Sequence, residues 1–337
     1  MHYLITGHTG FKGSWLALLL KAQGHTVSGI SLDPLPRSIY LEAQLSNIFE
    51  RDLRCDIRDL KQLQEQVVGT NADVVIHLAA QALVRESYKD PIGTFQTNVI
   101  GTLNLLESVK ASKSVKSALI ITTDKVYRNV DKHEGYVESD PLGGSDPYSA
   151  SKAAADIATQ SWIQSFAEIP ISIARAGNVI GAGDWAQDRL IPDLITAFNK
   201  NEDVVLRYPG AIRPWQHVLD CLNGYLCLVN ASIQTGTTGQ WNFGPTLELD
   251  KSVSVVAEAV SSQLNSRNSW VQDSGNFPHE AGLLLLNSNK ARKALNWNDK
   301  LGFSETIDWT VSGYQAVIQG ESTRNVLERQ IQAFLAL

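Results

Sequence analysis

The first half of the sequence alternates short apolar runs with longer segments of helical character. The apolar runs have the length of buried strands and cover residues 2–6, 27–32, a stretch ending before Cys55, 73–81, 117–123 and 171–175. The segments between them, such as 15–20 and 94–111, carry helix-forming residues. Strands that alternate with helices predict an α/β fold with a doubly wound parallel sheet, in which ligands bind at the carboxyl ends of the strands.

A glycine-rich loop joins the first expected strand to the first expected helix. Gly7, Gly10 and Gly13 are spaced Gly-x-x-Gly-x-x-Gly, and Asp33 follows the second strand 20 residues after Gly13. Glycines let the backbone approach a pyrophosphate at a helix N-terminus, and the acid accepts hydrogen bonds from the adenosine ribose. Because a carboxylate disfavours a 2′-phosphate, the pattern predicts NAD rather than NADP. The alternative is a glycine-rich turn in an ordinary α/β unit.

Other residues at the expected strand ends extend this cofactor site. Asp56 follows the third strand, where it either meets the adenine or caps a helix, and Ala79 and Ala80 are small enough for the backbone to pass close to the cofactor. Besides the three glycines, the residues assigned to NAD are Thr9, Phe11, Lys12, Asp33, Asp56, Ile57, Leu78, Ala79, Ala80, Asn98, Tyr148 and Lys152. His77 is interpreted as a core histidine.

Beyond residue 177 the pattern changes. We expect helices near 188–199, 218–231, 252–264, 288–295 and 303–318, a strand at 204–207, and a seventh strand of the main sheet at 241–243. Residues 1–180 with about 215–245 are therefore assigned to a Rossmann domain that binds NAD. Residues from about 181 to 214 and 246–337 are assigned to a smaller α/β C-terminal substrate-binding domain.

Tyr148 and Lys152 lie four residues apart on a helix that begins near Pro147, so they share one face. An ammonium group near a tyrosine favours the phenolate and lowers the tyrosine pKa. Such a pair can take a proton from an alcohol while a hydride leaves the same carbon. Alone, the spacing also fits an ordinary surface helix. Polar residues at the ends of other strands, among them Thr123 and Asn178, strengthen the chemical interpretation.

Composition and charge restrict the partners. The 337 residues carry a net charge of −6 with scattered Lys and Arg residues, which argues against nucleic-acid and membrane-surface partners. Three cysteines and the lack of a metal-type His/Cys cluster predict a reduced protein without a metal site. No segment resembles a signal peptide or the ~18 apolar residues of a membrane helix, so a cytoplasmic location is expected.

These features resemble the extended short-chain dehydrogenase/reductase family and, within it, the sugar-nucleotide 4,6-dehydratases. The resemblance rests on the glycine loop, Tyr148-x-x-x-Lys152 and Thr123, and on longer motifs between residues 6 and 218. The motifs are Thr6-Gly-His-Thr-Gly-Phe-Lys-Gly-Ser-Trp-Leu16, Thr122-Thr-Asp-Lys-Val-Tyr127, Arg175-Ala-Gly-Asn-Val-Ile-Gly181, Gly183-Asp-Trp-Ala186, Asp188-Arg-Leu-Ile-Pro-Asp193 and Arg213-Pro-Trp-Gln-His-Val218. Ala182 stands where the family pattern has another glycine.

The resemblance implies a redox-neutral loss of water from a nucleotide-linked hexose. Tyr148 removes the proton of the sugar 4-hydroxyl while C4 gives a hydride to NAD⁺; Thr123 binds that hydroxyl, and Lys152 supports Tyr148 and the nicotinamide ribose. Asp124 and Lys125 are assigned to the elimination across C5 and C6, after which the hydride returns to C6. The sequence does not decide which of the two is the acid, and the pair also fits a simple ion pair.

The resemblance also implies substrate and subunit contacts. Arg189 and Arg213 are assigned to the substrate diphosphate, because a guanidinium group binds phosphate oxygens bidentately, and Asn178 is assigned to the same group. Trp185 and Trp215 are assigned to stacking on the sugar or base, with a core or lid role as the alternative. The long helices near 94–111 and 150–166 resemble the dimer-forming pair of the family, which predicts a homodimer.

Two other functions stay open on sequence alone. A nucleotide-sugar 4-epimerase shares the cofactor loop, Tyr148 and Lys152, but it has no use for an acid–base pair at Asp124 and Lys125. A regulatory protein that binds a cofactor without catalysis is expected to lack Tyr148 or Lys152. Since both are present, a 4,6-dehydratase is the preferred prediction.

Overall fold

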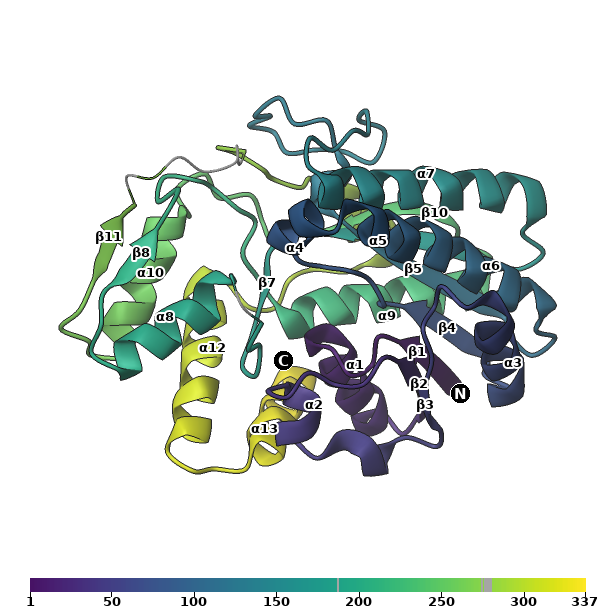
Figure 1. Cartoon of the computed structure of the whole chain (residues 1–337), viewed down its shortest axis with the longest axis horizontal. Helices are drawn as coiled ribbons and strands as arrows, with labels where there is room; N and C mark the ends of the chain where they lie inside the picture. Colours follow the sequence, from purple (N-terminus) through teal and green to yellow (C-terminus); the bar gives the residue numbers. More distant parts are fainter. Residues whose placement is uncertain (187, 274, 276–280) are drawn as a thin grey trace.

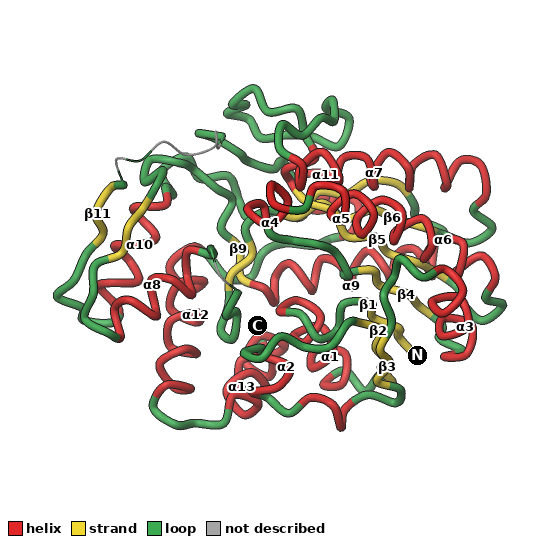
Figure 2. The backbone as a smooth tube through the Cα atoms, viewed as in Figure 1, coloured by secondary structure: helices red, strands yellow, loops and turns green. Residues whose placement is uncertain are grey.

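A parallel sheet of seven strands forms the centre of the molecule (Figures 1 and 2). The structure is a computed structural model that describes residues 1–186, 188–273, 275 and 281–337. The sheet has the order β10-β6-β5-β4-β1-β2-β3, and each neighbouring pair is parallel. Its strands are β1 (His2–Thr6), β2 (Thr26–Ser31), β3 (Asp52–Arg54), β4 (Val74–His77), β5 (Ser117–Thr123), β6 (Ile171–Ala176) and β10 (Gly239–Phe243). The doubly wound α/β prediction is therefore confirmed, including the seventh strand.

Alternate side chains of the strands enter two different cores, one on each face of the sheet. On β1, Leu4 joins the core beneath α3 (Leu60–Thr70) and α6 (Gly101–Ala111). Ile5 joins the core beneath α1 (Phe11–Ala22) and α9 (Val218–Thr235). Strands buried on both faces explain the nearly continuous apolar runs in the sequence. The helices that flank the sheet are α1 (Phe11–Ala22), α3 (Leu60–Thr70), α4 (Val84–Lys89), α5 (Pro91–Phe95), α6 (Gly101–Ala111), α7 (Pro147–Phe166) and α9 (Val218–Thr235).

The long helix expected over 94–111 is present but not uniform. It consists of α5, one π-helical turn η2 (Gln96–Ile100), and α6. A π-helical turn inserts one residue per turn and is frequent at functional sites. Here it contains Asn98, one of the residues assigned to the cofactor.

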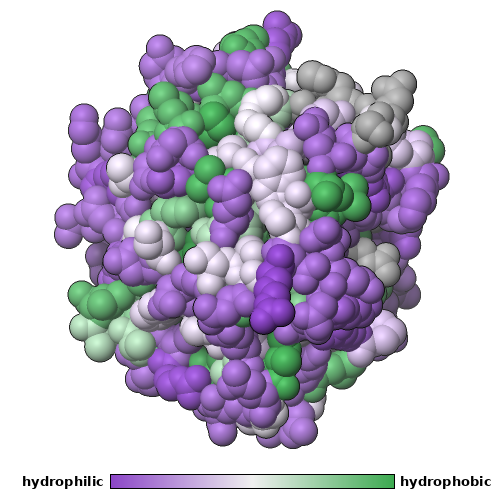
Figure 3. All heavy atoms as spheres, turned by 90° about the vertical axis from the view of Figure 1, so that its left-hand side faces the viewer, coloured by the Kyte–Doolittle hydropathy of each residue, from purple (hydrophilic) through white to green (hydrophobic). Residues whose placement is uncertain are grey.

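A smaller group of elements lies beside the carboxyl end of the sheet (Figure 1). A two-stranded parallel sheet of β8 (Val204–Leu206) and β11 (Trp270–Gln272) packs with α8 (Leu190–Asn199) and α10 (Val253–Gln263), next to α12 (Phe303–Ile318). A second short pair joins β7 (Val179–Ile180) to β9 (Gln216–His217). The outer face of this group is mostly hydrophilic (Figure 3).

Several short or late elements were not predicted. They are α2 (Ile39–Glu42), the 3-10 turns η1 (Leu45–Ile48) and η3 (Asp124–Val126), β11, and α13 (Thr323–Ala336); α11 (Asn289–Leu295) lies where a helix was expected. α13 packs against α1, although the two are far apart in the sequence. Among the described residues, no helix is long and apolar enough to cross a membrane, and no three His, Cys, Asp or Glu side chains gather in a way that suits a metal ion.

Candidate active site

The glycine loop folds tightly against the ends of β1 and β4. Gly7 has a φ of 75°, and a Cβ added there would lie 2.7 Å from the backbone nitrogen of Ala79. A Cβ added at Gly13 would lie 2.3 Å from the carbonyl oxygen of Gly7. Only glycine fits both positions. The loop leads directly into α1, so the helix N-terminus presents backbone amides where a pyrophosphate can bind; this cradle fits a dinucleotide.

Asp33 lies just beyond the end of β2, the strand that pairs with β1. Its side chain is 90% exposed, and its Oδ1 atom lies 3.2 Å from Nε of Arg54, which also binds Asp52. Thr9 fixes the loop beside this end, with its hydroxyl 2.7 Å from that of Ser31. Arg54 was not singled out from the sequence, because nothing in the sequence pairs the last residue of β3 with Asp33 across the sheet.

Asp56 and Ile57 lie just beyond β3. The Asp56 carboxylate accepts hydrogen bonds from the backbone and side chain of Arg58, while Asp59, and not Asp56, caps α3. The helix-cap alternative for Asp56 is therefore wrong. Ile57 is buried against Gly101 of α6.

Asn98 ties three segments together at the end of β4. Its side-chain amide donates to the backbone carbonyl of Gln81 at 3.0 Å and to the Ser151 hydroxyl at 2.9 Å, and its oxygen accepts from the Gln81 amide. The segment that begins at Leu78 is thereby held to α7. His77 is a satisfied core histidine as predicted, bonded to the hydroxyls of Thr6 and Thr102.

The residues proposed for proton transfer meet where β5 ends against the first turns of α7. Thr123 is the last residue of β5, and its hydroxyl donates to Asp124 at 2.9 Å. Asp146 caps α7 by accepting from the Ser149 amide at 3.0 Å, which places Tyr148 in the first turn. Lys152, one turn later, donates to the Ile121 carbonyl at 3.1 Å.

Burial perturbs the acid–base behaviour of this cluster. It raises the pKa of Tyr148 to about 12, opposed by hydrogen bonding with Thr123. The lowered tyrosine pKa expected from the sequence is therefore wrong, since desolvation outweighs the opposing effects of Thr123 and Arg189. Burial also lowers the pKa of Lys152 to about 8, helped by the charge of Lys12.

Asp124 is fully buried, and this burial raises its pKa, against the influence of Lys125, Thr123 and Arg213. Its Oδ2 atom has no hydrogen-bond partner among the described residues. A carboxyl group in this environment keeps its proton to higher pH than usual, so it is suited to act as an acid. Lys125, the next residue, is only partly buried.

Two arginines lie close enough to this cluster to affect its titration. Arg189 opposes the rise in the Tyr148 pKa, and Arg213 opposes the rise in the Asp124 pKa. Arg189 lies 3.0 Å from Asp184, and the buried Arg213 donates to its neighbouring carbonyl, that of Ile212. The Asn178 carbonyl accepts from Gln216, which pairs the segment after β6 with β9.

The two tryptophans assigned to stacking are engaged within the protein. Trp185 lies under the guanidinium of Arg37 at 3.5 Å, donates to Glu42 and packs edge-on against Tyr314. It thereby joins the loop after β7 to α2, which fits the alternative core or lid role.

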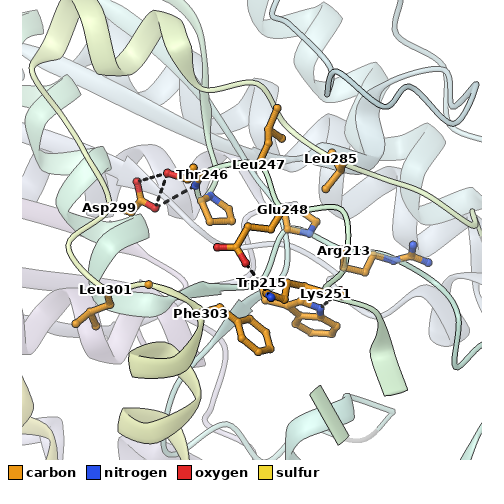
Figure 4. Close-up of a pocket in the computed structure, with 13 residues that line it drawn as sticks. Arg213, Trp215, Thr246, Leu247, Glu248, Lys251, Leu285, Asp299, Leu301 and Phe303 are labelled. Carbon is orange, nitrogen blue, oxygen red and sulfur yellow. Dashed lines mark hydrogen bonds and ion pairs between the residues drawn. The ribbon is translucent and has the colours of Figure 1, made fainter. Parts of the chain in front are cut away.

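Trp215 is almost fully buried, and its Nε1 donates to the Lys251 carbonyl. Its ring lies along a small pocket with Lys251 and Phe303, while the Arg213 side chain points away from them (Figure 4). The cavity has a volume of about 30 Å³.

Comparisons with known proteins relate this geometry to function. A family model described as GDP-mannose 4,6 dehydratase matches residues 4–310. The chain belongs to this family. It is 40% identical to the CDP-glucose 4,6-dehydratase of Salmonella typhimurium, over 98% of this chain and 95% of that protein.

Solved structures share the fold of this family member. A dTDP-glucose 4,6-dehydratase from Streptomyces venezuelae, solved with NAD, matches 94% of this chain and 97% of its own with a TM-score of 0.81 and 24% identity. A UDP-glucose 4-epimerase from Stenotrophomonas maltophila, also solved with NAD, matches 95% of this chain and 100% of its own with a TM-score of 0.84 and 19% identity. Because dehydratases and epimerases fit equally well, the fold does not separate the two reactions.

Proposed function

We propose that the chain is a hydro-lyase that converts CDP-glucose to CDP-4-dehydro-6-deoxyglucose with NAD as its cofactor. The observation that carries this proposal is the buried Asp124, with its raised pKa, placed 2.9 Å from the Thr123 hydroxyl beside Tyr148. The 40% identity to a CDP-glucose 4,6-dehydratase over nearly the whole chain supports the choice of substrate.

NAD⁺, when bound, supplies the acceptor for the C4 hydride and later returns that hydride to C6. Gly7, Gly10 and Gly13 hold its pyrophosphate, with Thr9, Phe11 and Lys12 in the same loop, and Asp33 holds its adenosine ribose. The remaining cofactor contacts are assigned to Asp56, Ile57, Leu78, Ala79, Ala80 and Asn98. Structures of the same fold that were solved with NAD support the choice of cofactor.

The first step removes the hydrogen atoms of the C4 carbinol. Tyr148 accepts the 4-hydroxyl proton as the hydride leaves C4, and Thr123 orients that hydroxyl by a hydrogen bond. Lys152 stabilises the phenolate that Tyr148 must form, because its ammonium group lies on the same helix face, one turn away. The product of this step is a 4-ketone, which acidifies the proton on C5.

The second step removes water across C5 and C6. Lys125 takes the C5 proton, and Asp124 gives its proton to the departing C6 hydroxyl, which leaves as water. After the hydride has returned to C6, Lys125 returns the proton to C5. At the end of the reaction Tyr148 has gained one proton and Asp124 has lost one, so the protein has no net change in protons. Proton exchange with solvent returns both groups to their starting states.

The diphosphate of the substrate is assigned to Arg189 and Arg213, with Asn178 as a further donor. Both arginines lie near the Tyr148 and Asp124 cluster, because their charges affect its titration, and this proximity supports the assignment. The indole N–H groups of Trp185 and Trp215 donate to protein acceptors. This supports the core or lid role for both tryptophans.

The mass of the product tests this function. Purified protein is incubated with NAD⁺ and CDP-glucose, and in parallel with the dTDP-, UDP- and GDP-linked sugars. Loss of one water from CDP-glucose, without net reduction of NAD⁺, is the expected result. Loss of water from another nucleotide sugar alone overturns the substrate but keeps the mechanism. An unchanged mass with inverted C4 makes the enzyme a 4-epimerase.

We infer further that the chain forms a homodimer through α5, α6 and α7. Large apolar side chains are exposed along this group of helices, and a second copy would cover them. They are Ile92 and Phe95 of α5, Ile100 of η2, which joins α5 to α6, and Ile157 and Phe166 of α7. Light scattering after size exclusion is expected to give a dimer, and Ile157→Asp is expected to give a monomer. The matched control is Val205→Asp, at an exposed position of β8.

We propose that two different sets of residues bind the cofactor and the substrate. Residues 1–180 and about 215–245 bind NAD, whereas residues from about 181 to 214 and 246–337, which include the few outside the described structure, bind the nucleotide sugar. A cytoplasmic location is proposed because the three cysteines are unpaired in the structure. Limited proteolysis with and without CDP tests the division, since CDP is expected to protect the second set of residues.

A further inference from the structure

A fully buried ion pair lies directly behind the candidate proton-transfer residues. Tyr148, Lys152 and Asp156 follow one another at intervals of four residues, so they line one face of α7. Asp156 is 0% exposed and Arg175 of β6 is 1% exposed. The two Asp156 oxygens accept from Nε and Nη2 of Arg175, each at 2.8 Å. This is a bidentate pair, the geometry with the greatest directional constraint.

The pair fixes α7 to the strands that carry the site. Asp156 also accepts from the Thr122 hydroxyl at 3.0 Å. Thr122 immediately precedes Thr123 on β5, and the two side chains point to opposite faces of the strand. The hydrogen bond that holds Thr122 to α7 therefore fixes the position of Thr123 relative to Tyr148. Nothing else in the described contacts links α7 to both β5 and β6 through charged groups.

Arg175 extends the connection to the loop after β5. Its Nη1 donates to the Tyr127 hydroxyl at 2.9 Å and to the Glu138 carbonyl at 3.0 Å. Tyr127 in turn donates to the buried Asn242 of β10 at 2.7 Å. Every one of these groups has a partner, so the network is geometrically determined rather than a loose cluster.

Stability alone does not account for such a pair. Two apolar side chains of similar size usually replace a buried ion pair without loss of stability, whereas removing one partner is strongly destabilising. An apolar replacement would lose the directional hydrogen bonds that fix α7 relative to β5 and β6. Resting on the dehydratase function proposed above, we propose that Asp156, held by Arg175, is a positioning residue that fixes Tyr148 and Lys152 against the end of β5.

Asp156 also acts on Lys152 through its charge. Three charged or titratable groups lie near the Lys152 ammonium. They are Lys12 of α1, His77 of β4 and, on α7 itself, Asp156. Lys12 lowers the Lys152 pKa, and Asp156 raises it. Removing the Asp156 carboxylate is therefore expected to lower that pKa further, so Lys152 loses its proton at a lower pH.

The central test replaces the pair by apolar groups. The variant Asp156→Leu/Arg175→Met is expected to fold and unfold cooperatively, but to have its kcat reduced by about 10- to 100-fold through misplacement of the reacting groups. KM for the nucleotide sugar should change little, because the pair does not face the substrate. The alkaline limb of the kcat profile should move to lower pH. Thr159→Val is the matched control, as Thr159 is equally buried on α7 but bonds only within its helix.

Single substitutions separate position from charge. Arg175→Lys keeps the charges but loses the bidentate grip, so kcat should fall while the alkaline limb stays in place. Asp156→Asn keeps the shape but loses the charge, so the limb should move. These two variants also test the proposal if the double variant does not fold.

A readout without substrate separates this proposal from the proposed function. The pH dependence of Lys152 acetylation by acetic anhydride, followed by peptide mass spectrometry, reports the lysine pKa whatever the enzyme acts upon. The midpoint is expected near 8 in the wild type and lower in both variants that lack the carboxylate. If kcat and this midpoint in the double variant match those of Thr159→Val, the positioning role is overturned. If the wild type dehydrates no nucleotide sugar but the midpoints shift as expected, the proposed function fails while the electrostatic role of Asp156 stands.

Discussion

The glycine loop and the end of β5 lie at the same edge of one sheet, but they are built in opposite ways. In the loop, binding space comes from missing side chains, since a Cβ at Gly7 or Gly13 would collide with backbone atoms. At the end of β5, function comes from side chains that are present and buried, above all Asp124 and Tyr148. The first region is therefore sensitive to added volume, and the second to changes of charge at constant volume.

The largest effect is expected from adding one methyl group to the loop. In Gly13→Ala the new Cβ meets the Gly7 carbonyl, so we expect a loss of about 3 kcal/mol in the free energy of unfolding and no measurable NAD binding. Chemical denaturation and calorimetric titration with NAD⁺ measure these effects. Gly210→Ala is the control, because no atom lies within 4 Å of a Cβ there. Normal NAD affinity in Gly13→Ala would show that the loop does not hold the cofactor.

The second largest effect is expected from a substitution that removes a charge without changing side-chain volume. Asp124→Asn removes the proposed acid, and we expect dehydration to fall by about 100- to 1,000-fold, in the range known for a lost acid catalyst. Oxidation at C4 should continue, so the absorbance of reduced NAD should accumulate after mixing with CDP-glucose. Asp220→Asn is the control, since Asp220 is another buried carboxyl with a raised pKa, bonded to the Lys300 and Leu301 amides. Normal dehydration by Asp124→Asn would place the acid elsewhere.

A third prediction concerns acid stability. Burial lowers the pKa of His77 and of His217 to about 3, while the unfolded chain binds protons near pH 6.5. Between these values the unfolded state holds more protons, so stability falls as the pH falls, by about 1.4 kcal/mol per pH unit for each histidine. Urea denaturation of His217→Asn should show a correspondingly shallower slope between pH 6 and about pH 4. The exposed His133→Asn should keep the slope of the wild type.

The smallest effect links the two regions. Lys12 belongs to the loop, yet its charge lowers the pKa of Lys152 behind the end of β5. In Lys12→Met, measured at saturating NAD⁺, the Lys152 pKa should rise and the alkaline limb of kcat should move up by a fraction of a pH unit. Lys21→Met, at the far end of α1, is the control. An unchanged alkaline limb of kcat would show that the charge of Lys12 in the loop does not affect Lys152.

Local sequence patterns predicted the loop better than the cluster. Gly7 to Gly13 and Asp33 follow strands within one short unit, so spacing alone carried the information. The cluster depends on burial, which spacing does not report: Lys152 was expected to lower the Tyr148 pKa, whereas desolvation raises it. Likewise Arg54 reaches Asp33 only through the pairing of β2 with β3.

Elements without a strong local pattern were missed for the same reason. β11 has only three residues, and its strand conformation depends on pairing with β8. The contacts of Trp185 are with Arg37, Glu42 and Tyr314, which lie far from it in the sequence. The family resemblance supplied the chemistry of Asp124 and Lys125, but not the burial that distinguishes them.

The packing of α13 on α1 has a consequence for biosynthesis. Leu327, Ile331 and Phe334 of α13 share one core with Trp15 and Leu19 of α1, the helix that begins directly after the glycine loop. A ribosome releases the glycine loop early, but the helix behind it lacks part of its apolar cover until α13 has emerged. We therefore expect chains truncated before residue 323 to leave the ribosome with a poorly supported α1 and to bind NAD weakly.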